Sequence, residues 1–462
     1  MSGRQQISKD QLSVLRSQLP LILSGLKKIP DHRNPKKIKH KITVLMLYGL
    51  LMFVFQFSSR REVNRDMSRP VFKQNLTEFF PELETLPHAD TLYRVLKTID
   101  IVQLERIQID VLKNLIRKKK FKRYLINNCY PVAIDGSQKL ARKDLFTEEL
   151  LQRKKRKKKD KNNEEKPEIE EEEDDYQYYV YVLEANLSFH NGMVIPLLSE
   201  FLEYQLGDQQ KSKQDCELRA FKRLSKKIKD YFSHLPIILL LDGLYANGPL
   251  MDYCQKKNWQ YMIVLQEADL KTVWREFHSL CTIKKNNHHQ QAWNGRQQSF
   301  TWVNNIEYDF DKGKKTIRVH LVVCDEIWQQ VNEQGEIEEK RSRHAWLSSR
   351  ELKRYNIHER CNLGARYRWG IEANFLVEKH QGYHYEHCFS LNWNALKGYH
   401  SLMRLAHLFN VLALFTVALL KTVKILGKRG LLQLVRATLS APWFEKGDIK
   451  ALTAKPFRLR LI

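Results

Sequence analysis

The stretch Arg366-Tyr-Arg-Trp-Gly-Ile-Glu-Ala-Asn-Phe-Leu-Val-Glu-Lys379 places a carboxylate between two cations. In a single α-helix, which turns by about 100° per residue, Arg368, Glu372 and Lys379 fall within roughly 40° of one another. This stripe suits a site in which the acid binds a metal ion and the cations bind phosphates. The alternative is a solvent-exposed i,i+4 ion pair worth about 0.2 to 0.5 kcal/mol.

Two aspartates upstream complete a candidate cluster of acids. Asp135 follows the apolar run 130–134, Asp242 follows the apolar run 236–241, and a glycine comes after each aspartate. Such runs predict buried strands that end at an aspartate in a turn. Strands of one sheet, facing the helix that carries Glu372, can bring the three acids together. Three clustered carboxylates require cations, and two Mg²⁺ ions about 3.5–4 Å apart satisfy them. The alternative is that each Asp-Gly pair is an ordinary turn.

The composition indicates a polyanionic partner. Among 462 residues, 78 are Lys or Arg and 53 are Asp or Glu, which gives a formal net charge of +25. This excess favours nucleic acid first and an anionic membrane surface second. The aromatic content of 11% is too high for a disordered chain. A chain of this length is expected to fold as two or three domains.

The cysteines and the apolar stretches indicate a cytoplasmic protein without membrane spans. The seven cysteines are scattered and form no CxxC pair, which favours reduced thiols over a disulfide framework or a zinc site. Residues 42–57 and 405–423 are too short or too polar for a span of about 20 apolar residues. We therefore expect buried helices there. The polar N-terminus carries no signal-peptide pattern.

Residues 1–128 are predicted to form an all-α N-terminal domain with a basic surface. Helical patterns cover residues 42–57 and 101–117, and Asp90 is a candidate cap for a helix over 91–98. The second helix ends in the basic run 117–123. This domain either binds DNA or is a solvated cap on the rest of the chain.

The remainder predicts an α/β fold in three further parts. Residues 129–265 alternate strands and helices around a turn at 190–192, and a charged segment over 150–175 is predicted to be a mobile loop. Residues 266–343 have short alternating runs and predict a β-rich insertion. Residues 344–462 are expected to complete the core, with the Glu372 helix and a long apolar helix over 393–426.

Taken together, residues 129–425 resemble the DDE transposases of bacterial insertion sequences. Three residues separate Arg368 from Glu372 and six separate Glu372 from Lys379, as in the Y-R-E-K signature of that family. The signature has its tyrosine at the position of Ala365. The nearest tyrosine here is Tyr367, beside Arg368.

This resemblance implies an RNase H-like core with a mixed sheet and a metal-dependent reaction on DNA. Asp135, Asp242 and Glu372 would be the catalytic residues and would hold two Mg²⁺ ions, with Mn²⁺ as a substitute. Arg368, Lys379 and Tyr367 would bind DNA. The enzyme would nick double-stranded DNA at the transposon ends and join the freed 3′-hydroxyl to target DNA. A homodimer in the synaptic complex and association with the bacterial nucleoid would follow.

Other functions fit parts of the same pattern. One is a metal-dependent nuclease on the same core that performs no strand transfer, and another is a non-catalytic DNA-binding relative. A third is a membrane-associated protein. Within the predicted insertion, Trp293 and Trp302 either stack on an unpaired base or fill the core of a hairpin.

Overall fold

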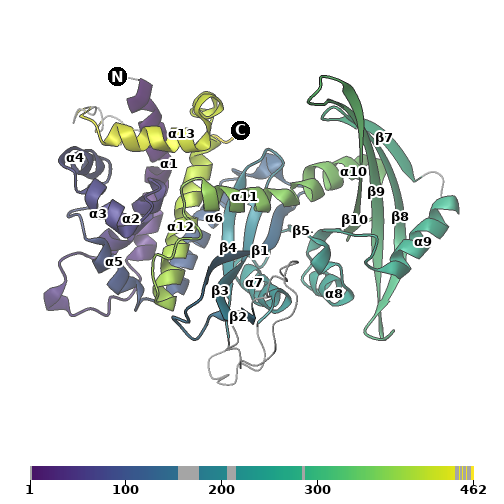
Figure 1. Cartoon of the computed structure of the whole chain (residues 1–462), viewed down its shortest axis with the longest axis horizontal. Coiled ribbons are helices and arrows are strands. Elements are labelled where there is room, and N and C mark those ends of the chain that lie inside the picture. The colour runs from purple at the N-terminus through teal and green to yellow at the C-terminus, as the bar shows by residue number, and fades with distance from the viewer. Residues whose placement is uncertain are drawn as a thin grey trace, which may run out of the picture.

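A computed structural model describes residues 3–154, 176–204, 215–283, 287–442 and 459–462, together with 447, 450 and 454. Figure 1 shows helices from both ends of the chain on one side, a sheet in the middle and long strands on the other side. Of the predicted charged loop over 150–175, residues 155–175 lie outside the described residues. The segment before them forms strand β2, Leu151–Lys154.

The N-terminal region is helical, as predicted. Its helices are α1 (Gly3–Leu26), α2 (Ile42–Val54), α3 (Arg60–Met67), α4 (Pro70–Phe79), α5 (Ala89–Leu96) and α6 (Ile101–Arg117). The predicted buried helix in 42–57 is confirmed, because nearly every residue of α2 is buried. The predicted cap at Asp90 is wrong. Helix α5 begins at Ala89, two residues before the predicted start, and the ring of His88 caps it by accepting a hydrogen bond from the Asp90 backbone N–H.

The sheet is mixed, which confirms an α/β fold. Its strands are β1 (Tyr130–Arg142), β2, β3 (Tyr176–Ser188), β4 (Val194–Leu202), β5 (Ile237–Leu241), β6 (Gln260–Val264), β7 (His288–Trp293), β8 (Arg296–Phe310), β9 (Lys315–Val331) and β10 (Ile337–Ser348). They lie in the order β2-β3-β1-β5-β6-β10-β9-β8-β7, with β4 also paired to β3. Strand β1 is antiparallel to β3 and parallel to β5, and β5 is parallel to β6.

The predicted turn at Asp135-Gly136 is wrong, because β1 continues through it. Gly136 pairs with Leu183 of β3. A Cβ atom on Gly136 would lie 2.3 Å from Cε1 of Tyr181, so the ring of Tyr181 occupies the space that any other side chain would need. Gly136 therefore allows β1 and β3 to pack closely, and the chain does not turn there.

The long strands continue the central sheet. Helix α9 (Lys271–Ile283) precedes them, and β10 runs through the boundary predicted at residue 343. The end of β10, residues 346–348, pairs with β6. The three predicted boundaries between the four domains stay predictions.

Further helices cover the sheet or pack beside it. They are α7 (Glu217–Tyr231), α8 (Gly248–Lys256), α10 (Arg354–Ile357), α11 (Gly370–His380), α12 (Trp393–Leu414) and α13 (Leu420–Leu439). The predicted single helix over 393–426 is wrong. The chain leaves the helix after Leu414 because Thr416 forms a β-bridge with Leu461 and Val417 N–H donates to the Arg460 carbonyl.

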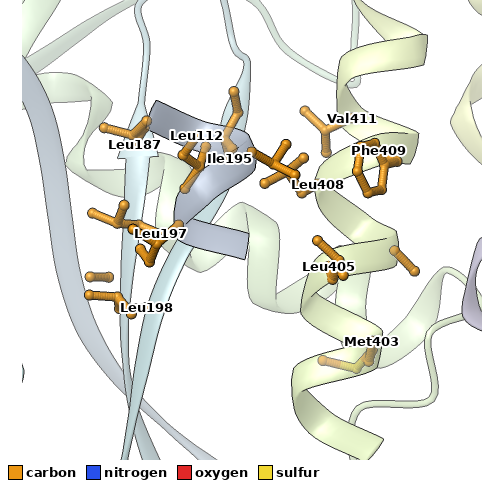
Figure 2. Packing of buried hydrophobic residues seen from close by; sticks show 14 of the residues in the cluster. Leu112, Leu187, Ile195, Leu197, Leu198, Met403, Leu405, Leu408, Phe409 and Val411 are labelled. Carbon is orange, nitrogen blue, oxygen red and sulfur yellow. The ribbon is translucent and has the colours of Figure 1, made fainter. Parts of the chain in front are cut away.

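Helix α12 forms the centre of the hydrophobic core. Its side chain Leu408 lies beside Ile195 of β4 and Leu112 of α6, with Leu405 about one turn away, and all four residues are at most 3% exposed (Figure 2). Burying one side chain of this kind completely stabilises the folded state by roughly 1.5–3 kcal/mol relative to leaving it exposed. Within the described ranges, no helix is both long enough and apolar enough to cross a membrane.

Candidate active site

The two predicted aspartates stand level on neighbouring parallel strands. Ala133 of β1 pairs with Leu240 of β5, so the same register two residues further along brings Asp135 level with Asp242. Asp242 follows the last residue of β5, and its Oδ1 accepts a hydrogen bond from Leu244 N–H at 3.1 Å. The structure thus brings these two acids to one place, although β1 continues beyond Asp135.

Asp135 lies in an environment that disfavours its charge. Its side chain is 19% exposed, and Gly136 N–H donates to its Oδ1 at 2.8 Å. Burial and the negative charge of Asp242 raise the pKa of Asp135 to about 6. A position of this kind favours a nearby cation.

The stretch from Arg366 to Lys379 departs from the predicted single α-helix. A π-helical segment, His358–Gly364, leads into a 3₁₀ segment, Ala365–Trp369, and α11 begins only at Gly370. The reason is close contact with β3. Ser188 Oγ donates to the Tyr367 carbonyl at 2.5 Å. A Cβ on Gly370 would lie 2.3 Å from Ser188 Oγ.

Arg368 joins two of the predicted acids despite this irregular backbone. Its Nη2 lies 2.8 Å from Glu372 Oε1, and its Nη1 lies 3.9 Å from Asp135 Oδ2. Its guanidinium carbon lies 4.8 Å from the ring centroid of Trp369. Only 7% of the Arg368 side chain is exposed, so this is not the solvent-exposed ion pair of the simpler interpretation.

The other two predicted DNA-binding residues have different partners. Lys379 Nζ lies 3.0 Å from Glu386 Oε1, and the Lys379 side chain is 21% exposed. Tyr367 is half-buried, with its ring centroid 6.4 Å from that of His190. Burial raises the pKa of the Tyr367 hydroxyl.

Glu217 is a fourth acid that the sequence patterns did not single out. It begins α7 and accepts hydrogen bonds from the hydroxyls of Tyr245 at 2.7 Å and Tyr181 at 3.2 Å. Burial and the charge of Asp242 raise the pKa of Glu217, and Glu217 in turn raises the pKa of Asp135. An acid in the first turn of a helix is common, so no sequence signal distinguished it.

Magnesium fits the chemistry of this site. Asp135 and Asp242 offer the hard oxygen ligands that Mg²⁺ prefers, and the raised pKa of Asp135 indicates a local demand for positive charge. Glu372 is instead engaged by Arg368. Among the residues that the structure describes, no group of three or more His, Cys, Asp and Glu side chains is close enough to hold a metal ion.

A cavity of about 470 Å³ opens beside Arg368. Its lining combines cations and aromatic rings, including Arg366, Arg368, Trp274, Trp346 and Trp369. Such a lining suits phosphates and unpaired bases.

The two tryptophans considered for base stacking differ in exposure. Trp302 is 3% exposed and belongs to the core, so the hairpin-core interpretation is correct for it. Trp293 is half-buried, and the guanidinium carbon of Arg366 lies 5.5 Å from its ring centroid.

Comparison with known families gives a match to the N-terminal helices. Residues 23–111 match the family model described as DDE_Tnp_1-associated. The match runs from the last turn of α1 into α6 and does not include the acids of the candidate site. No curated protein matches the chain. The family match points to the DDE transposases in general.

Proposed function

We propose that this chain is a DDE-type transposase that cleaves double-stranded DNA at the ends of an insertion sequence and joins them to target DNA. The observation that carries the proposal is that Asp242 stands level with Asp135 in the sheet, while Arg368 contacts both Asp135 and Glu372. The match of residues 23–111 to a transposase-associated family supports it independently of these residues. The net charge of +25 fits a DNA partner.

The strand arrangement supports an RNase H-like core. Strands β4, β3 and β1 are successively antiparallel, and β5 and β6 continue the sheet parallel to β1. Helix α11 covers the face of this unit through Ile371 and Phe375, which share a core cluster with Ala133 and Leu240. This is the arrangement expected if the acids of β1, β5 and α11 act together.

Each residue has a proposed role. Asp135, Asp242 and Glu372 would hold Mg²⁺, which supplies Lewis-acid activation of the attacking oxygen and stabilisation of the leaving oxygen. The buried fork of Arg368 would orient the scissile phosphate. Lys379 would add a point charge further along the DNA strand, and Tyr367 would contact the DNA backbone beside the phosphate that Arg368 holds. A homodimer would hold two transposon ends together.

A plasmid that carries this chain's own coding sequence with its flanking DNA tests the proposal. With purified protein and Mg²⁺, we expect strand breaks at both flanks and, with a second plasmid present, joined products. The Asp135→Asn protein serves as the matched control and should give neither.

The products distinguish the alternatives. Breaks without joining would identify a nuclease that performs no strand transfer. Binding without breaks, under Mg²⁺ and under Mn²⁺, would contradict an enzymatic function and favour a DNA-binding relative.

A further inference from the structure

A fully buried ionic cluster lies behind the candidate active site. Arg404 of α12 is 1% exposed, and the side chains of Glu184 on β3 and Glu378 on α11 are completely buried. Charged groups are rarely buried unless they are paired, and an arrangement of this kind is costly to build. The active-site chemistry proposed above does not use it.

The cluster connects the helix of Glu372 to α12. Arg404 Nη1 binds Glu378 Oε1 at 2.8 Å, and His407 Nδ1 lies 2.7 Å from the same oxygen. Glu378 follows Glu372 on α11 and immediately precedes Lys379. Helix α12 is itself fixed in the core against β4 and α6 (Figure 2).

The same guanidinium reaches the strand beside Asp135. Arg404 Nη2 lies 3.2 Å from Glu184 Oε2, and it also donates to Asn186 Oδ1 at 2.5 Å. Glu184 is the direct cross-strand partner of Asp135 in the antiparallel pairing of β3 with β1. One side chain therefore ties the helix that carries Glu372 to the strand paired with Asp135.

The surrounding groups favour ionised carboxylates. Burial would raise the pKa of Glu378, but Arg404 and His407 lower it below its ordinary value. Burial lowers the pKa of His400 and of His407 below the ordinary value. Two lysines also face the cluster: Lys139, which donates to the Tyr385 carbonyl at 2.7 Å, and Lys428, whose charge acts on His407.

We propose that Arg404 is a positioning residue for the proposed DNA cleavage, holding α11 in register so that Glu372 faces Asp135. The inference rests on the proposed function. It follows from geometry: the planar fork of arginine spans two carboxylates at once, whereas a lysine ammonium is a single point charge. Shifts of about 1 Å at reacting groups lower rates by about 100-fold.

The Arg404→Lys variant tests this role because it keeps the buried charge and loses the fork. We expect the single-turnover cleavage rate to fall by about 10- to 100-fold, while the Kd for the same DNA stays within about twofold. Amide hydrogen exchange should accelerate in 370–380 and stay unchanged in 130–142. Glu378→Gln, which keeps the shape of the side chain, is a second variant. We expect it too to lower the cleavage rate while leaving the Kd for DNA nearly unchanged.

Arg436→Lys is the matched control. Arg436 Nη2 similarly joins Glu62 at 2.5 Å and Asp66 at 2.6 Å, linking α13 to α3 away from the candidate site. Its substitution should change the melting temperature without changing the cleavage rate per folded molecule. A wild-type rate in both Arg404→Lys and Glu378→Gln, or a loss that only follows the folded fraction, would overturn the inference. If Asp135→Asn also cleaves normally, the proposed function itself fails.

Discussion

Arg368 and Glu372 form a 2.8 Å ion pair whose cation is buried and whose acid is 35% exposed. The same guanidinium lies 3.9 Å from Asp135. The protein's own cation therefore partly neutralises two of the three acids that the proposed chemistry requires. Binding of a phosphate to Arg368 would release both carboxylates to other cations.

Substitution of the acids should separate DNA binding from cleavage. Asp135→Asn, Asp242→Asn and Glu372→Gln preserve shape but each removes a charged oxygen ligand. We expect each to lower single-turnover cleavage by at least about 100-fold, equivalent to about 2.7 kcal/mol of transition-state stabilisation. Gel-shift affinity for the same DNA should stay near wild type. Substantial cleavage by any one of them would remove that residue from the site.

Asp135 should make the free protein less stable as the pH rises. Its folded pKa of about 6 lies above its ordinary value, so the folded state binds the proton more tightly than the unfolded chain does. The resulting stabilisation is complete below about pH 4 and is lost as the pH rises through 6. In EDTA at pH 7.5, Asp135→Asn should therefore increase the free energy of unfolding by about 1 to 3 kcal/mol.

Urea unfolding of both proteins at several pH values checks this dependence. The advantage of the asparagine variant in unfolding free energy should shrink towards zero as the pH falls below about 4, because Asp135 then becomes protonated in the unfolded chain as well. An advantage that is constant with pH would mean that the substitution acts through packing, and not through the charge of Asp135.

The sequence predicted well those elements that local pattern determines. The apolar run in α2, the amphipathic pattern of α6 and the fully buried β5 all carry their signal within the segment itself. Asp242 was also placed correctly at the end of a strand.

The errors arose where a distant segment overrides a local signal. Asp135-Gly136 has the composition of a turn, but pairing with β3 carries β1 through it. The break before α11 depends on a contact between Gly370 and Ser188 that no helical pattern contains. The only sign of the ionic cluster in the sequence is that charged residues such as Glu184 and Arg404 occur inside apolar runs.

The two Asp-Gly pairs should respond differently to alanine. Gly136→Ala introduces a Cβ at 2.3 Å from the Tyr181 ring, and overpacking of this kind typically costs about 1–3 kcal/mol. Gly243→Ala is the matched control, because the nearest atom to its Cβ is Asp269 Oδ2 at 3.4 Å. The control should stay within about 0.5 kcal/mol of wild type. Equal losses of unfolding free energy would show that close packing at Gly136 is not what distinguishes the two positions.

Arg368 should couple metal binding to DNA binding. Its guanidinium competes with a metal ion for Glu372 and Asp135, while a DNA phosphate competes with those acids for the guanidinium. Two ligands that each weaken the same internal contact bind with positive coupling, typically about 1–3 kcal/mol. Wild-type protein should therefore bind Mn²⁺ about 5- to 150-fold more tightly when DNA is present.

The Arg368→Met variant separates this coupling from a simple loss of structure. Without the guanidinium the acids lose the internal counter-charge that Arg368 supplies, so Mn²⁺ should bind tightly even without DNA, and added DNA should change that affinity little. Cleavage should still fall, because the scissile phosphate loses its bidentate partner. Lys379→Ala is the control: it removes a cation paired with Glu386, so it should weaken DNA binding and flatten its salt dependence by about one unit while leaving DNA-free Mn²⁺ affinity unchanged. Calorimetric Mn²⁺ titrations with and without DNA measure all three proteins. If Arg368→Met binds Mn²⁺ more weakly than wild type in the absence of DNA, the arginine supports the metal site and does not compete with it.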